Sequence, residues 1–204
     1  MARTVLITGF EPFGGESENP SWEAVRQLEG ETIDGYRLAP RRMPCVFGEA
    51  IARLEEEIAA LSPSVVICVG QAGGRAEISL ERIAINLQDA RIPDNAGAQP
   101  LDREVIEGGP AAYFSGLPVK AILRDLLAAG VPAAISHTAG TFVCNHIFYG
   151  ACHAARRLGR RIGHMDEAGA PSLSVAVIVE ALRIAVASTL RNEVDAALIG
   201  GAVS

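Results

Sequence analysis

Short apolar runs rich in β-branched residues alternate with amphipathic helical patterns, and this alternation constrains the fold more than any other feature. The runs at 4–10 and 64–70 are apolar and have a glycine at or next to their last residue. Both features are typical of buried strands of a parallel sheet. The helical patterns between such runs supply the crossovers that parallel strands require. We therefore expect an α/β fold: a three-layer α/β/α sandwich with a mixed, largely parallel twisted sheet.

The remaining segments fit this architecture. Residues 47–63 form the clearest amphipathic helical pattern, and residues 78–94 alternate apolar and polar side chains, which predicts an antiparallel or edge strand. Residues 91–117 are rich in glycine and proline and predict a long surface excursion. No repeat or linker divides the chain, so we expect 1–204 to form a single domain. Further strands are expected at 36–45 and 133–140, and further helices at 19–30, 119–130, 143–159 and 172–190.

Charge and cysteine usage exclude several classes of protein. The formal net charge is −6 without a dense basic run, so nucleic acid is not an expected partner. No apolar stretch approaches the roughly 20 residues of a membrane span, and the N-terminal residues lack a signal-peptide pattern, which predicts a cytoplasmic chain. The four cysteines form no CxxC pair and no Cys/His zinc spacing. We therefore expect reduced thiols, no metal and no cofactor.

Cys144 has the most suggestive setting among the cysteines. It follows the Gly-Thr turn of "AGTFVCNHIFY" and opens the predicted helix 143–159. Backbone N–H groups at a helix N-terminus lower a thiol pKa and can stabilise an oxyanion, so Cys144 is a candidate nucleophile. A buried cysteine that only packs in the first helical turn stays an alternative. Cys45 and Cys68 are expected to be buried structural residues.

A cysteine nucleophile needs a base, usually histidine, and a group that orients the base. His146 and His153 share the predicted helix with Cys144 but fall on roughly the opposite face. His137 lies in the strand before the turn and is poorly placed. His164, in a segment that reads as a loop between two helices, is the remaining candidate base.

Three carboxylates could orient the base: Glu77, Glu81 and Asp89. Glu81 alternates with apolar residues in "ISLERIAINL" and so has a defined side of its strand. A solvent-facing strand carboxylate is the competing interpretation. At the first strand end, "GFEPFGG" lacks a nucleotide-binding pattern, and Phe10 and Phe13 there predict either an apolar slot for a flat uncharged group or core aromatics.

Three blocks of the sequence resemble the type I pyroglutamyl peptidases, also called pyrrolidone carboxyl peptidases. These blocks are "GFEPFGGESENPSWEAV", "GQAGGRAEISLERIAINLQDARIPDNAG" and "AGTFVCNHIFY", and they match in order over nearly the whole chain. The resemblance implies a cysteine exopeptidase that removes N-terminal pyroglutamyl residues from peptides through an acyl-enzyme. It also implies a Cys–His–Glu triad on an α/β/α sandwich, and a homo-oligomer, either a dimer or a tetramer.

The resemblance also implies roles for individual residues. Cys144 would be the nucleophile and Glu81 would orient the histidine. The residues that would contact substrate are Phe10, Phe13, Gln71, Phe142 and Arg91. Backbone groups around Gln71 would read the lactam N–H and C=O.

One block departs from the family pattern. Members carry the catalytic histidine in a block of the form G-F-[IVM]-H-[IVL]-P-x-L-P, whereas this chain runs "RRIGHMDEAGAPSLSV". In one interpretation His164 is the catalytic histidine of a shortened loop. In the other, the histidine-bearing segment is missing near residue 163. Because "MDEAG" does not resemble the residues after the family histidine, the sequence favours the second interpretation.

Two other functions compete with a peptidase. A pyroglutamate-binding protein on the same scaffold would have an incomplete triad and bind without hydrolysis. A nucleoside phosphorylase-like enzyme would need phosphate-binding residues, which "GFEPFGG" does not supply.

Overall fold

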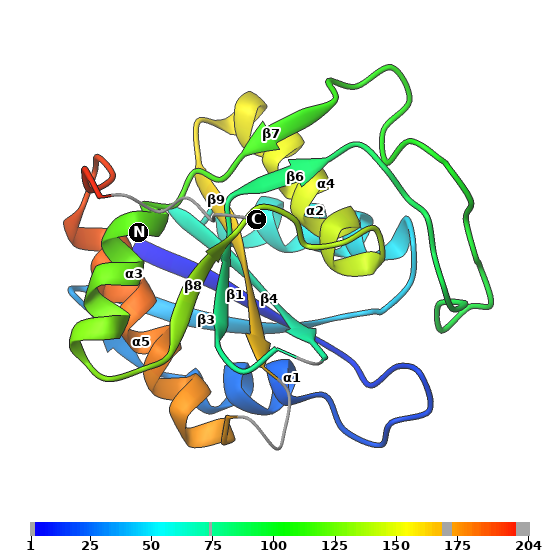
Figure 1. The fold of residues 1–204 in the computed structure, drawn as a ribbon. Helices are drawn as coiled ribbons and strands as arrows, with labels where there is room; N and C mark the ends of the chain where they lie inside the picture. The colour runs from blue at the N-terminus through cyan, green and yellow to red at the C-terminus, as the bar shows by residue number, and fades with distance from the viewer. Residues whose placement is uncertain (1–2, 74, 169–172, 199–204) are drawn as a thin grey trace.

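Strands and helices alternate along the chain in the computed structural model, which describes residues 3–73, 75–168 and 173–198 (Figure 1). The strands are β1 (Arg3–Phe10), β2 (Thr32–Ile33), β3 (Tyr36–Met43), β4 (Val65–Ala72), β5 (Ile78–Glu81), β6 (Ile83–Ile85), β7 (Ala112–Phe114), β8 (Ala133–Ser136) and β9 (Arg161–Ala168). The helices are α1 (Pro20–Val25), α2 (Glu49–Leu61), α3 (Val119–Ala128), α4 (Val143–Leu158) and α5 (Val175–Arg191), with a 3-10 turn η1 (Arg26–Leu28) after α1.

The main sheet has the strand order β2-β3-β1-β4-β9-β5-β8 among the described residues. The pairs β1–β3, β1–β4, β4–β9 and β5–β8 are parallel, whereas β2–β3 and β5–β9 are antiparallel. The sheet is therefore mixed and largely parallel, as predicted. The four mutually parallel strands β1, β3, β4 and β9 bring their carboxyl ends to one edge, where ligands of such sheets bind.

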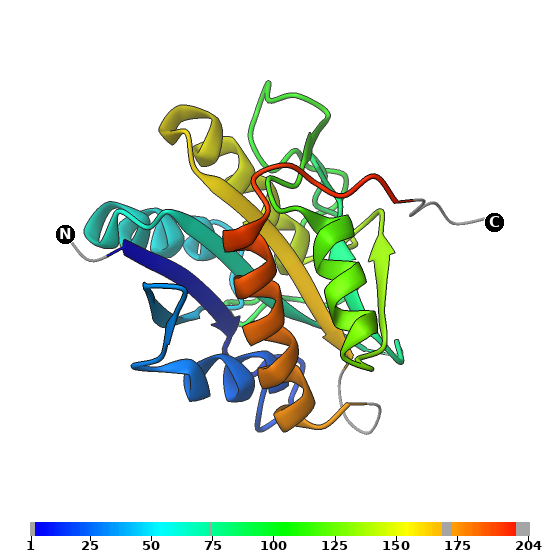
Figure 2. The ribbon, with the colours of Figure 1, turned by 90° about the vertical axis from the view of Figure 1, so that its left-hand side faces the viewer.

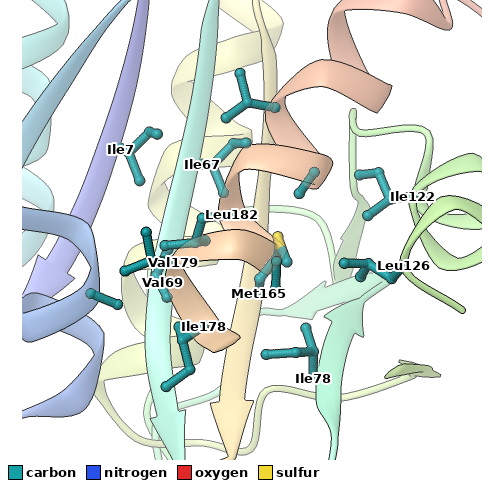
Figure 3. Close-up of a cluster of buried hydrophobic side chains, with 14 of the residues drawn as sticks. Ile7, Ile67, Val69, Ile78, Ile122, Leu126, Met165, Ile178, Val179 and Leu182 are labelled. Carbon is teal, nitrogen blue, oxygen red and sulfur yellow. The ribbon is translucent and has the colours of Figure 1, made fainter. Parts of the chain in front are cut away.

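Helices cover both faces of the sheet, which gives the predicted three layers (Figures 1 and 2). Alternate residues of β1 separate the two cores: Val5 and Ile7 pack with α1, α3 and α5, whereas Leu6 packs with α2 and α4. In the first core, Ile67 and Val69 of β4 meet Ile178, Val179 and Leu182 of α5 (Figure 3). Apolar side chains therefore pack between the sheet and the helices on each face.

The helices begin and end at the residues that favour those positions. The Asn19 side chain accepts a hydrogen bond from Ser21 N at 3.0 Å, and Ser174 caps α5 in the same way by accepting from Val177 N. α4 ends at Gly159, which adopts the left-handed conformation with φ of 62°. Within the described ranges, no helix combines the length and apolarity needed to cross a membrane.

The segment around His164 corrects the sequence prediction. Residues 161–168 are not a loop but β9, an interior strand paired with β4 along its whole length and with β5 on its other side. The run "RIGHMDEA" contains only Ile162 and Met165 as large apolar residues, so it lacks the pattern of a buried strand. Pairing on both sides, rather than local propensity, places it in the sheet.

The segment 78–94 is partly as predicted. β5 is antiparallel to β9, but it is an interior strand, and β8 forms the edge of the sheet. The chain leaves the main sheet after Glu81, and β6 pairs with β7 in a separate two-stranded sheet. The excursion at 91–117 contains one short strand, β7, and an isolated antiparallel bridge between Arg103 and Gln88.

Candidate active site

A cavity of about 720 Å³ opens where the ends of β4 and β9 meet the start of α4. Residues from five separate segments line it. They include Phe13 from the loop after β1, Gln71 from β4, Arg91 from the 91–117 excursion, Phe142 and Cys144 from the start of α4, and Asp166 from β9. Four of the predicted substrate-contacting residues, Phe13, Gln71, Arg91 and Phe142, therefore meet at one cavity with the predicted nucleophile.

Cys144 is the second residue of α4 and is half-buried in the cavity wall. The N-cap residue, Phe142, forms no side-chain hydrogen bond to the first turn, so backbone N–H groups there can serve a ligand. Burial and the Asp166 carboxylate raise the pKa of the thiol, while hydrogen bonds with His164 and the Gln71 backbone oppose this shift. His164 is the neighbouring group that can accept the thiol proton.

His164 lies beside Cys144, buried within the sheet. Its ring stacks on Phe148 of α4, with ring centroids 5.6 Å apart and an interplanar angle of 25°. Its Nε2 atom is 2.9 Å from Asp166 Oδ1, and these two atoms and Cys144 Sγ lie within 4.8 Å of one another. Burial lowers the pKa of His164, but the Asp166 carboxylate and hydrogen bonds with Cys144 and Cys68 together outweigh it, so the pKa lies well above its ordinary value.

Glu81 lies on the strand next to His164. It is paired with His164 across the antiparallel β5–β9 ladder, so both side chains project to the same face of the sheet. Glu81 is fully buried, which excludes the solvent-facing interpretation. Burial and the Asp166 charge raise its pKa to about 7, although Arg75 donates to Glu81 Oε1 at 2.9 Å. Glu81 Oε2 and His164 Nδ1 are both buried without a hydrogen-bond partner, and their residues are direct partners in the β5–β9 register.

Gly70 of β4 leaves the space in which these groups meet. A Cβ atom at this position would lie 2.5 Å from Asp166 Oδ1, 2.6 Å from Cys144 Sγ and 3.1 Å from His164 Nε2. Any side chain would therefore push the three groups apart. Since Gly70 pairs with Asp166 in the β4–β9 register, the requirement for glycine follows directly from the sheet topology.

Aromatic rings form one wall of the cavity. Phe13 and Phe142 lie with ring centroids 5.9 Å apart, and Phe47 packs edge-on against Phe142 at 5.4 Å. Arg91 is exposed at the rim. Phe10 is only 2% exposed and belongs to the core cluster against which Phe13 and Phe142 pack, so it supports the wall from beneath. A direct contact between Phe10 and a substrate stays a prediction.

The other histidines have structural partners or lie outside the cavity. His146 Nε2 accepts a hydrogen bond from Gly48 N at 2.8 Å, and burial lowers its pKa to about 4. His153 Nδ1 pairs with the Tyr113 hydroxyl at 2.8 Å. His137 is exposed after β8. Of the four histidines, His164 is the one placed against Cys144.

The comparisons with known proteins agree with this arrangement. The family model described as pyroglutamyl peptidase matches residues 3–192. The chain belongs to the pyroglutamyl peptidase family. It is 52% identical to pyrrolidone-carboxylate peptidase 1 of Ralstonia nicotianae, over 97% of this chain and 98% of that protein. It is 54% identical to the pyrrolidone-carboxylate peptidase of Cupriavidus pinatubonensis, over 98% of both chains.

Solved structures of family members share the fold. Pyroglutamyl peptidase I from Bacillus amyloliquefaciens superposes with a TM-score of 0.94 at 45% identity, over 97% of this chain and all of that one. A mutant pyrrolidone carboxyl peptidase from Pyrococcus furiosus gives a TM-score of 0.90 at 37% identity, over 92% of this chain and 98% of that one. The family resemblance and the α/β prediction are therefore confirmed.

The histidine block still distinguishes this chain from the family pattern. His164 lies beside the Cys144 thiol, as the first interpretation requires, and is followed by Asp166 two residues later. Residues 169–172, which follow this block, lie outside the described residues. Sequence reasoning missed both Asp166 and Gly70. Recognition of β9 as a strand would have found Asp166, because residues two apart on a strand share a face.

Proposed function

We propose that this chain hydrolyses the bond that follows an N-terminal pyroglutamyl residue, with Cys144 as nucleophile, His164 as acid and base, and Glu81 as the residue that positions His164. One observation carries the proposal: the buried His164 ring approaches the Cys144 thiol at the wall of a cavity with an aromatic side. Membership of the pyroglutamyl peptidase family supports the same reaction.

The reaction divides into two proton-coupled steps. His164 takes the thiol proton, and Sγ attacks the carbonyl carbon of the pyroglutamyl residue to give a tetrahedral oxyanion. In this proposal the backbone N–H groups in the first turn of α4, which have no side-chain cap, stabilise that charge. The imidazolium returns the proton to the leaving amine, which leaves a thioester on Cys144. Water, deprotonated by His164, then releases pyroglutamate and the free thiol.

The cavity suits a small flat lactam. Phe13 and Phe142 offer apolar surfaces to the five-membered ring, which carries no charge. Gln71, whose backbone forms a hydrogen bond with the thiol, lines the cavity at the end of β4, and in this proposal its backbone reads polar atoms of the ring. A pyroglutamate-binding protein without activity is not favoured, because the histidine that such a protein would lack is present beside the thiol.

The test compares two chromogenic anilides that differ only in the first residue. Pyroglutamyl anilide is expected to be cleaved, and the prolyl anilide, which lacks the lactam oxygen, to be cleaved roughly 10⁴-fold less efficiently. Cys144→Ser is expected to lower turnover at least about 10³-fold. Equal cleavage of both anilides would contradict the proposed specificity. Full turnover by Cys144→Ser would contradict the proposed nucleophile.

We also propose a cytoplasmic homo-oligomer. Cys45, Cys68, Cys144 and Cys152 are all free thiols, which suits a reducing compartment. Assembly as a dimer or tetramer rests on the family resemblance. Light scattering with size-exclusion chromatography tests it, and a mass equal to that of one chain across the accessible concentration range would contradict it.

A further inference from the structure

The Arg75 side chain reaches from the loop between β4 and β5 to the buried carboxylate of Glu81. Its Nη1 atom donates to Glu81 Oε1 at 2.9 Å, and its Nη2 atom donates to the backbone oxygen of Thr138 at 3.3 Å. Arg75 therefore joins the loop that precedes Glu81 to the loop that precedes Cys144. We propose that Arg75 is a positioning residue of the hydrolase, which keeps Glu81 ionised and directs its second oxygen toward His164. This role rests on the proposed function.

The buried cluster holds more acidic groups than one imidazolium can balance. Glu81 of β5 and Asp166 of β9 are both buried, and the Cys144 thiol of α4 lies beside His164 and Asp166. A protonated His164 neutralises only one negative charge. A buried carboxylate without a counter-charge takes up a proton. Arg75 supplies the second positive charge, and a guanidinium does not lose it when His164 changes its protonation state.

The groups that face Glu81 act on its ionisation in opposite directions. Burial and the Asp166 charge raise the pKa of Glu81 to about 7, whereas a hydrogen bond with Ser136 of β8, the His164 charge and the hydrogen bond with Arg75 lower it. Because this pKa lies near neutrality, the loss of one favourable partner converts much of Glu81 to the neutral acid at pH 7. The neutral acid stabilises a protonated His164 far less than the carboxylate does.

The ion pair also selects which Glu81 oxygen serves His164. Arg75 occupies Oε1, whereas Oε2 is buried and has no hydrogen-bond partner among the described residues. Nδ1 of His164 is unpartnered in the same part of the chain, and the two residues are paired in the β5–β9 ladder. In this proposal the ionised Oε2 accepts from Nδ1–H, so that Nε2 is the nitrogen that exchanges a proton with Cys144.

Arg75 can be replaced without opening a void in the core. Its side chain is 35% exposed and lines the cavity. The role can therefore be tested in folded variants of the full-length chain. Arg75→Gln removes the charge, Arg75→Lys keeps it, and Arg75→Met is a second neutral variant in case Arg75→Gln does not fold. Arg103→Gln is the matched control, because Arg103 is exposed on the excursion outside the cavity.

The first readout is the pH profile of kcat/KM for the pyroglutamyl anilide. A neighbouring cation lowers a carboxyl pKa by about 1–3 units, so Arg75→Gln should move the acid limb up by about 1 unit or more. At pH 7 the ionised share of Glu81 then falls from about one half to about one tenth, and activity falls about fivefold, in kcat rather than KM. Arg75→Lys and Arg103→Gln should keep the limb in place. A purely structural role would lower activity equally at every pH.

The second readout asks whether Arg75 acts through Glu81. In a Glu81→Gln background the carboxylate is already absent, so adding Arg75→Gln should change kcat by less than about twofold. Carbon-13 NMR of labelled glutamate carboxyl groups, assigned with Glu81→Gln, follows the Glu81 titration without turnover. Its midpoint should rise in Arg75→Gln and stay in place in Arg75→Lys.

The outcomes separate this proposal from the proposed function. An unmoved acid limb or an unmoved Glu81 titration in a neutral Arg75 variant would overturn it, as would a full additional loss in the Glu81→Gln background. A chain whose Glu81 titration depends on Arg75, but which never cleaves the anilide at any pH, would refute the proposed function and leave the coupling between Arg75 and Glu81 standing.

Discussion

Gly70→Ala tests how closely the reacting groups must pack. The substitution adds one methyl group to an interior strand, at a position without left-handed backbone. The new Cβ atom would lie 2.5 Å from Asp166 Oδ1 and 2.6 Å from Cys144 Sγ, whereas ordinary contacts are at 3.4–4 Å. These groups must therefore retreat by about 1 Å, and overpacking of this kind costs about 1–3 kcal/mol of unfolding free energy.

The same displacement predicts the loss of activity. A misplacement of about 1 Å at a reacting centre costs about 10²-fold in rate, which corresponds to about 2.7 kcal/mol of transition-state stabilisation. We expect kcat/KM for the pyroglutamyl anilide to fall about 100-fold in Gly70→Ala, at a temperature where circular dichroism shows that the variant is folded. Gly73→Ala, at the residue after β4, is the matched control: Gly73 lines the same cavity, but a Cβ atom there meets nothing within 4 Å. Its free energy of unfolding should change by no more than about 0.5 kcal/mol.

The refuting result is specific. Wild-type kcat/KM in folded Gly70→Ala would mean that the Cys144, His164 and Asp166 side chains can separate without cost, and that their contact over Gly70 does not position the reaction. An equal loss in Gly73→Ala would show that the strand end tolerates no substitution, so the loss in Gly70→Ala could not be assigned to the three contacts.

Three further predictions follow from the charges around the site. Asp166→Asn should move both limbs of the kcat/KM pH profile to lower pH, because the carboxylate raises the pKa values of Cys144 and His164; unmoved limbs would contradict this. Glu81→Gln should lower kcat roughly 10²–10⁴-fold with little change in KM, measured on the pyroglutamyl anilide, because His164 loses its positioning partner. Burial raises the pKa of Glu167 from 4.5 to about 8, so the folded chain keeps a proton that the unfolded chain releases. Stability should therefore fall as pH rises through this window, by about 1.4 kcal/mol per unit, and denaturant titrations should show a smaller pH dependence for Glu167→Gln.

The sequence predicts those parts of the fold whose local pattern agrees with their tertiary role. β1 and β4 are apolar, β-branched runs because both faces are covered by helices. The helix that carries Cys144 is predicted with its first residue correct, since a turn with Gly140 precedes it and Gly159 ends it. Phe13 was a candidate from its place in a glycine-rich strand end, whereas Gln71 and Phe142 were found through the family resemblance, because residues so far apart in the sequence carry no local signal of their contact.

β9 could not be predicted because its stability comes from its neighbours. Gly163, His164, Asp166 and Glu167 would be unusual in an isolated strand, and they are accommodated because β4 and β5 satisfy the backbone on both sides. His164 was therefore reached only by elimination. The alternation in 78–85 predicted that the Glu81 side chain projects to one defined face of its strand. It did not predict that this face would be buried. The upward shift in the Cys144 pKa comes first from burial and then from Asp166, which lies on a strand that the pattern did not reveal.

A covalent bond between Cys144 and the pyroglutamyl group is the central step of the proposed reaction. The direct measurement mixes the chain with a pyroglutamyl ester, quenches turnover with acid, and maps the adduct by peptide mass spectrometry. We expect one pyroglutamyl group on the peptide that contains Cys144. The amount of this adduct should be higher in His164→Asn than in the wild type when hydrolysis of the thioester slows more than its formation. A fully active chain whose adduct lies on another residue, or whose turnover survives Cys144→Ser, would contradict the mechanism.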